Sequence, residues 1–249
     1  MLTEERWRLI LDILEKEKTV TVPELEARLG ASPSTIRRDL SQLHKAGKLV
    51  KVHGGATCLD GRYMVQEMSM AEKKTLHLEE KQAIGRYAAR LITPDDFVYI
   101  DSGTTAEALA DAITETGAVY MTNSVMIAMK LAVKGCRVFL PEGEMKSRTE
   151  AIVGGLAADS IKKYHFTLGF WGTNGVDEKA GFTTPEVNEA LVKQVSMKQA
   201  ARRYVLCDRS KFSVISPVSF GEFESATIVT DRIPDKKYQK YEHIVEVMK

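Results

Sequence analysis

The stretch TVTVPELEARLGASPSTIRRDLSQLHKAGKLVKVHGG, residues 19–55, decides how the N-terminal part of this chain folds. It reads as a helix, a tight turn, a second helix and a basic hairpin, which is the outline of a winged helix-turn-helix. From residue 28 to residue 53 it contains six arginines and lysines and a single acid, Asp39. The whole chain of 249 residues has a net charge of only +1. Positive charge is therefore concentrated in this stretch, which favours a polyanionic partner such as DNA.

Capping residues predict where the helices of this stretch begin and end. Thr21 and Glu24 have the spacing of a capping box, and Gly30 fits the end of the same helix. Ser32 can cap the next helix, whose apolar residues fall on one side. Upstream, apolar residues recur at helical spacing over residues 3–17, which predicts a further amphipathic helix.

The helix after Ser32 carries short hydroxyls and guanidiniums on the face opposite its leucines. A guanidinium can donate two hydrogen bonds to guanine, and recognition helices place their first turns against the bases. Gly47 then allows a turn into an alternating strand over residues 48–53, which leads to a wing. We expect DNA contacts from these residues: Ser34, Thr35, Arg37, Arg38, Ser41, Lys51 and His53. An Arg–Arg pair alone is more often a solvated helix face, and Asp39 could pair with a neighbouring arginine; the combined pattern favours DNA binding.

Composition excludes several classes of protein. The chain has no apolar run near 18 residues, and its first residues, MLTEERWR, do not resemble a secretory signal. Its three cysteines, at positions 58, 136 and 207, are far apart, as expected for reduced thiols of a cytoplasmic protein. The five histidines are scattered. We therefore expect no membrane partner, no metal site and no cofactor.

The remainder of the chain predicts a second, larger domain. We expect a winged helix-turn-helix over residues 3–58, a linker over residues 59–75 and an α/β domain over residues 76–249. In the last of these, apolar strands alternate with helices, which implies a mostly parallel sheet covered on both faces. The expected strands are 97–100, 119–121, 137–140, 167–170, 204–206 and 227–229, and the expected helices include 105–115, 124–134 and 185–201.

Two strand-to-helix junctions carry residues suited to a phosphate. Such sheets bind ligands at the carboxyl ends of their strands, where N–H groups of a following helix face an anion. One such junction is more often a simple turn and cap, but two in succession favour an anion site. The junctions contain Asp101, Ser102, Gly103, Thr104 and Thr105 after the first strand, and Thr122, Asn123 and Ser124 after the second.

Further polar residues downstream complete a candidate site. Lysine and arginine can neutralise a phosphate, and Asn, Thr and carboxylates suit sugar hydroxyls. Each of these residues, taken singly, is more often a surface charge or part of a turn, so the prediction rests on the set. The set comprises Lys146, Arg148, Asn174, Thr183, Glu189, Lys193 and Lys211.

Both halves of the sequence resemble one family. STIRRDL at 34–40 and HGGA at 53–56 are similar to the winged helix of DeoR-type regulators of bacterial sugar operons. From about residue 76 the chain resembles the sugar-phosphate-sensing half of that family, whose fold is similar to ribose-5-phosphate isomerase and the coenzyme A transferases. The segments closest in look to fructose-operon repressors, whose effector is fructose 1-phosphate, are KSRT at 146–149, GTNG at 172–175, GFTTPEVNEALVK at 181–193 and DRSKF at 208–212.

Three departures from the family pattern bear on the specific sugar. Glu142-Gly143 stands where a double glycine is usual, Glu150 replaces a common glycine, and Thr167-Leu168 stands where Asp-Lys is expected. A carboxylate added near a phosphate site raises repulsion unless it points away or binds a hydroxyl.

The resemblance implies a transcription repressor controlled by a phosphorylated sugar. Its partners would be double-stranded operator DNA, the sugar phosphate and further copies of itself, because palindromic operators require at least a dimer. An activator, or a regulator of another phosphosugar, remains open. The rival class is a sugar-phosphate isomerase using Asp177, Glu189 and Lys193, but the sequence shows no compact catalytic constellation for the carboxylate base that such chemistry needs.

Overall fold

The computed structural model describes residues 3–17, 19–46, 48–52, 54–58 and 69–248. The chain divides into two compact units, Met1–Tyr63 and Met64–Lys249. In the part that is described, no helix is long and apolar enough to cross a membrane.

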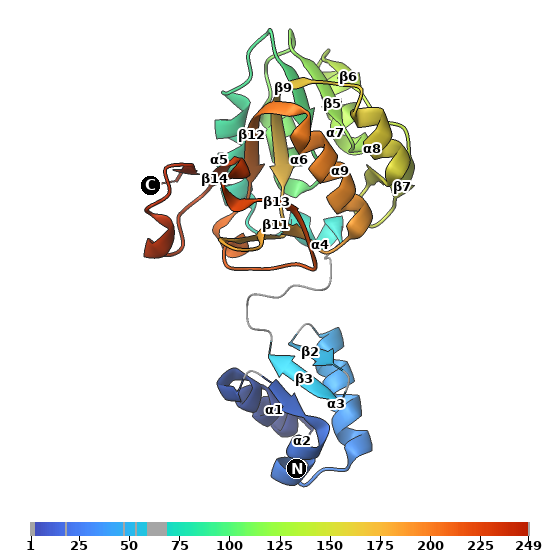
Figure 1. The fold of residues 1–249 in the computed structure, drawn as a ribbon, viewed down its shortest axis with the longest axis vertical. Helices are drawn as coiled ribbons and strands as arrows, with labels where there is room; N and C mark the ends of the chain where they lie inside the picture. The colour runs from blue at the N-terminus through green and yellow to red at the C-terminus, as the bar shows by residue number, and fades with distance from the viewer. Residues whose placement is uncertain (1–2, 18, 47, 53, 59–68, 249) are drawn as a thin grey trace. The chain divides into compact units, whose positions relative to one another are not determined.

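The N-terminal unit packs three helices against a small antiparallel sheet (Figure 1). Its core is a single cluster of buried aliphatic side chains contributed by all three helices and by the sheet. The elements are α1 (Thr3–Glu17), β1 (Thr19–Thr21), α2 (Val22–Leu29), α3 (Pro33–Lys45), β2 (Leu49–Val52) and β3 (Gly55–Cys58).

The predicted helix boundaries of this unit are confirmed. Thr21 and Glu24 form a complete capping box, and Gly30 ends α2 in the left-handed conformation, with φ of 61°. Ser32 accepts a hydrogen bond from the Thr35 N–H at the start of α3. Strand β1 was not predicted, and β3, the second strand of the predicted hairpin, was given no residue range. Gly55 permits their close approach, because a Cβ at that position would lie 2.3 Å from the Val20 carbonyl oxygen.

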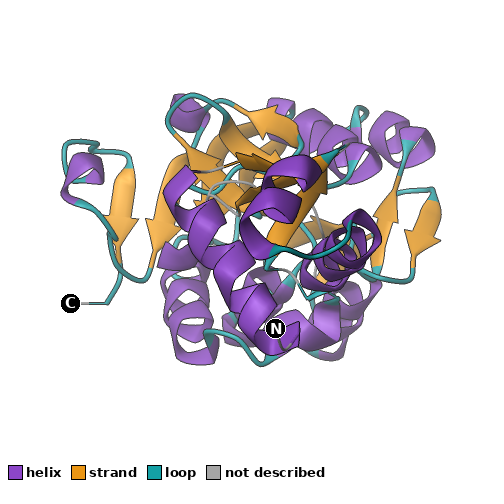
Figure 2. Cartoon of the chain, turned by 90° about the horizontal axis from the view of Figure 1, so that it is seen from below, coloured by secondary structure: helices purple, strands orange, loops and turns teal. Residues whose placement is uncertain are grey.

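The larger unit is built on a sheet of seven parallel strands in the order β15-β14-β12-β9-β4-β5-β6. The parallel sheet predicted from the sequence is thus confirmed, and Figure 2 shows the C-terminal end of the chain at one edge of it. The strands are β4 (Phe97–Ile100), β5 (Val119–Thr122), β6 (Arg137–Phe139), β9 (Phe166–Gly172), β12 (Ala200–Leu206), β14 (Thr227–Thr230) and β15 (Ile244–Glu246).

Helices cover both faces of this sheet. In β4 the side chains of Val98 and Ile100 pack with those of α5, α6 and α7, whereas Tyr99 packs in the other cluster with α8 and α9. This alternation is the reason that the strand is apolar throughout. The helices are α5 (Leu78–Ala89), α6 (Thr104–Ala112), α7 (Val125–Val133), α8 (Gly155–Ile161) and α9 (Val187–Lys198).

Smaller elements connect the strands and helices of this unit. The stretch expected to be linker ends in a short helix, so that part of the expectation is corrected: α4 spans Met70–Lys74 and buries Met70. The helix expected at 185–201 stops at Lys198, because the chain enters β12 at Ala200. The remaining elements are β7 (Glu144–Lys146), β8 (Ala151–Val153), β10 (Gly175–Asp177), β11 (Gly181–Thr184), β13 (Val218–Gly221), η1 (Arg209–Lys211), η2 (Phe223–Ser225) and η3 (Lys236–Tyr238).

Candidate DNA-binding face and effector site

Helix α3 directs two guanidiniums into solvent. Arg37 and Arg38 are exposed, and neither forms an ion pair or side-chain hydrogen bond with another described residue. Ser34 and Thr35 lie in the first turn, where their hydroxyls are 3.0 and 2.9 Å from the Ser32 hydroxyl. The predicted polar face of this helix therefore exists, and within the described structure the guanidiniums of its two arginines are available to bind a ligand.

Asp39, the single acid of the basic stretch, faces α1 and not the solvent. Asp39 is 3% exposed and accepts hydrogen bonds from Arg6 Nη2 at 3.1 Å and Trp7 Nε1 at 2.9 Å, both on α1. The possibility that Asp39 pairs with an adjacent arginine is therefore wrong. Arg28, in contrast, is paired with Glu17 at 2.5 Å, so its charge is balanced locally.

Hydrogen bonds fasten strand β2 to α3. Lys51 Nζ donates to Ser41 Oγ at 2.7 Å, and Ser41 in turn donates to the carbonyl oxygen of Arg37 at 2.7 Å. The ring Nδ1 of His44 lies 3.2 Å from the Leu49 carbonyl oxygen. Sequence reasoning missed His44, which has no motif to mark it. The predicted contact His53 lies outside the described residues.

At the carboxyl end of β4, the start of α6 is open. Gly103 is the N-cap with φ of 123°, and no side chain caps the helix. Ser102, Thr104 and Thr105 are partly exposed, and their hydroxyls make no hydrogen bond to another side chain within the described ranges. The first turn thus presents free N–H groups and hydroxyls, which suits an anion.

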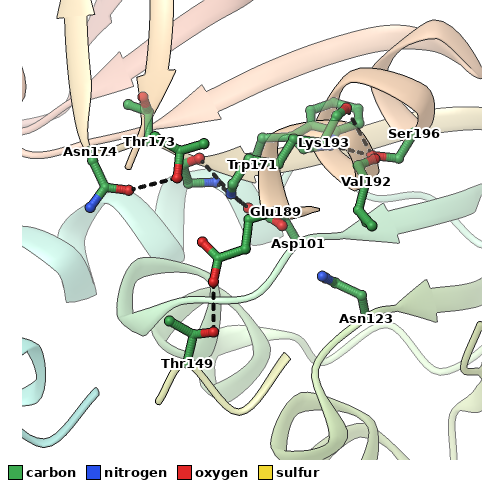
Figure 3. Close-up of polar contacts among 12 residues, drawn as sticks. Asp101, Asn123, Thr149, Trp171, Thr173, Asn174, Glu189, Val192, Lys193 and Ser196 are labelled. Carbon is green, nitrogen blue, oxygen red and sulfur yellow. Dashed lines mark hydrogen bonds and ion pairs between the residues drawn. The ribbon is translucent and has the colours of Figure 1, made fainter. Parts of the chain in front are cut away.

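A buried ion pair lies directly beside this loop. Asp101 is fully buried, is paired with Lys193 of α9, and accepts a hydrogen bond from the Gly172 N–H at 3.1 Å (Figure 3). Lys193 Nζ also donates to the Gly172 carbonyl oxygen at 3.0 Å. Burial raises the pKa of Asp101, and the Lys193 charge opposes that rise. The pair joins the ends of β4 and β9 to α9.

The carboxylate of Glu189 lies on α9 itself, one turn before Lys193. Glu189 Oε1 accepts hydrogen bonds from Lys146 Nζ at 2.9 Å and from the Thr149 hydroxyl at 2.7 Å (Figure 3). Burial raises the pKa of Glu189, but the Thr149 hydrogen bond and the charges of Lys193 and Lys146 outweigh it, so the net pKa is lowered. The structure therefore brings together three predicted site residues, Lys146, Glu189 and Lys193.

Other predicted residues form hydrogen bonds within the larger unit. Thr122 and Ser124 are buried; the Thr122 hydroxyl accepts from the Ser124 N–H at 3.1 Å, and Ser124 caps α7. The Thr183 hydroxyl accepts from the Ser216 N–H at 2.9 Å, and the Asn174 side-chain oxygen lies 3.3 Å from the Thr184 hydroxyl.

Arg148 and Lys211 were also predicted for the site. Arg148 is exposed, and its carbonyl oxygen accepts from the Met70 N–H of α4 at 3.4 Å. Lys211 is half-buried in η1. Burial raises the pKa of Asp208, but the Lys211 charge and Ser210 hydrogen bonds hold it below its usual value. Sequence reasoning missed Lys81 of α5, a buried lysine whose pKa is lowered by burial.

Comparisons with known proteins agree over both units. Residues 6–62 match the DeoR-like helix-turn-helix domain, and residues 76–232 match the DeoR C terminal sensor domain. The "Uncharacterized HTH-type transcriptional regulator FruR" of Bacillus subtilis is 42% identical over 100% of both chains. The lactose phosphotransferase system repressor of Streptococcus mutans is 33% identical, also over 100% of both chains.

Two solved structures resemble the fold. The full-length sorbitol operon regulator SorC from Klebsiella pneumoniae aligns with a TM-score of 0.44 at 12% identity, covering 91% of this chain and 96% of SorC. Ribose 5 phosphate isomerase A from Neisseria gonorrhoeae aligns with a TM-score of 0.40 at 14% identity, covering 55% of this chain and 53% of the isomerase.

Proposed function

This chain belongs to the DeoR family of transcriptional regulators, and from that premise we propose that it represses a sugar-utilisation operon until a phosphorylated sugar, fructose 1-phosphate, binds its larger unit. The operator would be bound by α3 and the adjoining strands, and the sugar phosphate by the loops at the carboxyl ends of β4, β5 and β9.

The DNA-binding half of the proposal is carried by the uncommitted guanidiniums of Arg37 and Arg38. The nearest acid in sequence, Asp39, is taken up by Arg6 and Trp7 on the other side of the helix. The positive field at the exposed face of α3 is therefore not cancelled from within the helix, and it can be neutralised by phosphates or by a guanine edge. Lys51, held beside α3 by Ser41, adds a further cation.

The effector half is supported by the open start of α6 and by the charges around it. Helix N–H groups and free hydroxyls at residues 102–105 suit a phosphate. Lys146 and Arg148 supply cations on the hairpin that faces α9. Fructose 1-phosphate is our choice of effector because the four segments from 146 to 212 resemble fructose-operon repressors and because a relative named FruR is 42% identical over the full chain.

Repression and its relief follow from differential binding. The sugar phosphate must bind more tightly to an arrangement of the protein that binds DNA poorly, and DNA must weaken effector binding by the same factor. A palindromic operator would be occupied by a homo-oligomer, whose two-fold symmetry matches that of the two half-sites.

A gel-shift titration tests the proposal. A duplex selected by the protein from a random pool serves as the probe, and fructose 1-phosphate, fructose 6-phosphate and ribose 5-phosphate are added separately. We expect fructose 1-phosphate to release the duplex at the lowest concentration. The same sugars are incubated with the protein and analysed for products, because thermal stabilisation without turnover separates a sensor from an isomerase. Protein that selects no duplex, or that binds no sugar phosphate, would contradict the proposal.

A further inference from the structure

Several buried oxygen atoms at the proposed effector site lack hydrogen-bond donors. Within the described residues, Oε2 of Glu150, Oδ1 of Asn123 and Oδ1 of Asp101 are all buried without a hydrogen-bond partner. Asn123 is 2% exposed and Asp101 is fully buried. Leaving a buried polar group without a hydrogen bond is unfavourable, so such atoms indicate a missing donor.

These three residues come from neighbouring parts of one edge. Asp101 and Asn123 follow β4 and β5, which pair in parallel with Ile100 opposite Thr122. The Asn123 side-chain amide N–H donates to the Ile152 carbonyl oxygen at 3.2 Å, and the main-chain carbonyl oxygen of Asn123 accepts from the Ile152 N–H at 2.7 Å. A bridge between Ser124 and Ala151 continues this contact. Glu150, the residue before β8, therefore lies beside the end of β5. In Figure 3 the Asn123 amide points toward the Glu189–Thr149 pair.

Glu150 also has an unfavourable backbone conformation. Its φ is 54°, in the left-handed region that is unfavourable for a residue with a Cβ. Non-glycine residues in such conformations cluster at ligand sites, where the surrounding structure holds them in place. Glycine would remove this strain, yet the chain places a carboxylate here, directly after Thr149, which binds Glu189.

The missing partner must supply hydrogen-bond donors. A phosphate dianion offers only acceptors, so it cannot satisfy these atoms. A metal ion is also a poor match, because no group of three metal-ligating side chains occurs among the residues that the structure describes. Hydroxyl groups of a sugar are donors, and they would lie next to a phosphate held at the start of α6 and by Lys146.

We propose that Glu150, with Asn123 beside it, accepts hydrogen bonds from hydroxyl groups of the effector and thereby determines which sugar phosphate this protein recognises. This inference rests on the proposed function and adds the specificity-determining residue. Glu150 does not contact the phosphate, and its carboxylate selects for a hydroxyl in the position that its Oε2 faces.

Isothermal titration of the full chain tests the inference. The ligands are fructose 1-phosphate, its single-deoxy analogues and inorganic phosphate. Glu150→Gln and Glu150→Gly are compared with wild type, and Glu144→Gln serves as the control because Glu144 is exposed on the same hairpin. We expect both Glu150 variants to lose about tenfold to a hundredfold in affinity for fructose 1-phosphate, the effect of a hydrogen bond to a charged group. Affinity for inorganic phosphate should not change.

The deoxy series and the glycine variant make the outcome decisive. The deoxy sugar that lacks the hydroxyl bound by Glu150 should bind wild type more weakly than fructose 1-phosphate does. To the Glu150 variants, this deoxy sugar and fructose 1-phosphate should bind with equal affinity. Glu150→Gly relieves the positive φ, so its thermal unfolding midpoint should not fall, and weak binding cannot then be attributed to misfolding. Unchanged sugar affinity and ranking in both variants would overturn the inference while leaving the proposed function intact. Wild type that binds none of the sugar phosphates would instead overturn the proposed function.

Discussion

Replacing Asp39 with Asn should unfold the N-terminal unit under conditions in which Arg38→Ala, one residue earlier, leaves it folded. The Asp39 carboxylate is 3% exposed and binds the Arg6 guanidinium and the Trp7 indole. The Arg6 side chain is 11% exposed, and the substitution removes the negative charge that its guanidinium faces. Breaking a buried ion pair costs about 3–5 kcal/mol. A unit of roughly 60 residues has about 3–9 kcal/mol of stability in total, so a large part of it is lost.

Hydrogen exchange read by mass spectrometry separates the two variants in the full chain. Peptides from residues 3–46 should exchange rapidly in Asp39→Asn and at the wild-type rate in Arg38→Ala. In a gel shift, Arg38→Ala should bind the selected duplex with about 5- to 150-fold lower affinity, the value of a specific base contact of about 1–3 kcal/mol. Protected peptides in Asp39→Asn, or full DNA affinity in Arg38→Ala, would refute the division of roles between these neighbours.

The larger unit permits three further tests. Lys193→Met should lower the free energy of unfolding in urea by about 3–5 kcal/mol, because the Asp101 charge stays buried without its partner; adding Asp101→Leu should recover part of it. Gly103→Ala should cost about 1–3 kcal/mol and weaken the thermal shift given by inorganic phosphate, because φ of 123° is unfavourable for alanine. The pKa of Glu189 is lower in the folded protein than its ordinary value of 4.5, so the ionised carboxylate stabilises the fold fully above pH 4.5 and this contribution is lost as pH falls through the folded pKa. Glu189→Gln should therefore make the free energy of unfolding depend less on pH below 4.5. Parallel pH profiles for the variant and wild type would contradict this.

Local patterns in the sequence were sufficient for the boundaries of α2 and for six of the seven strands of the parallel sheet; the edge strand β15 was not predicted. Thr21, Glu24 and Gly30 act on backbone groups a few residues away, so their spacing predicts the boundaries of α2 directly. The apolar run at 97–100 predicts a buried parallel strand for a similarly local reason, since both of its faces are covered by helices. The open loop at 102–105 follows from that strand, because the glycine precedes the next helix at once.

Contacts between distant residues were beyond sequence reasoning. Arg6 and Asp39 are separated by 33 residues, and Asp101 and Lys193 by 92. Which ammonium or guanidinium meets which carboxylate depends on how helices pack, and the sequence carries no local pattern for it. The conformation of Glu150 is likewise set by the hairpin around it, although the departure from glycine at this position marks it in the sequence.

Adjacent residues in this chain have opposite roles because their side chains leave the backbone in different directions. Successive residues of a helix project about 100° apart, so Arg38 faces solvent while Asp39 faces α1. At the end of β4 the same division separates Asp101, buried against Lys193, from Ser102, which is partly exposed at the start of α6. The charges that hold the fold together are thus buried and paired over long separations in sequence. The guanidiniums of Arg37 and Arg38, proposed to meet DNA, are exposed and form no ion pair with another described residue. This contrast is what the substitutions at positions 38 and 39 measure.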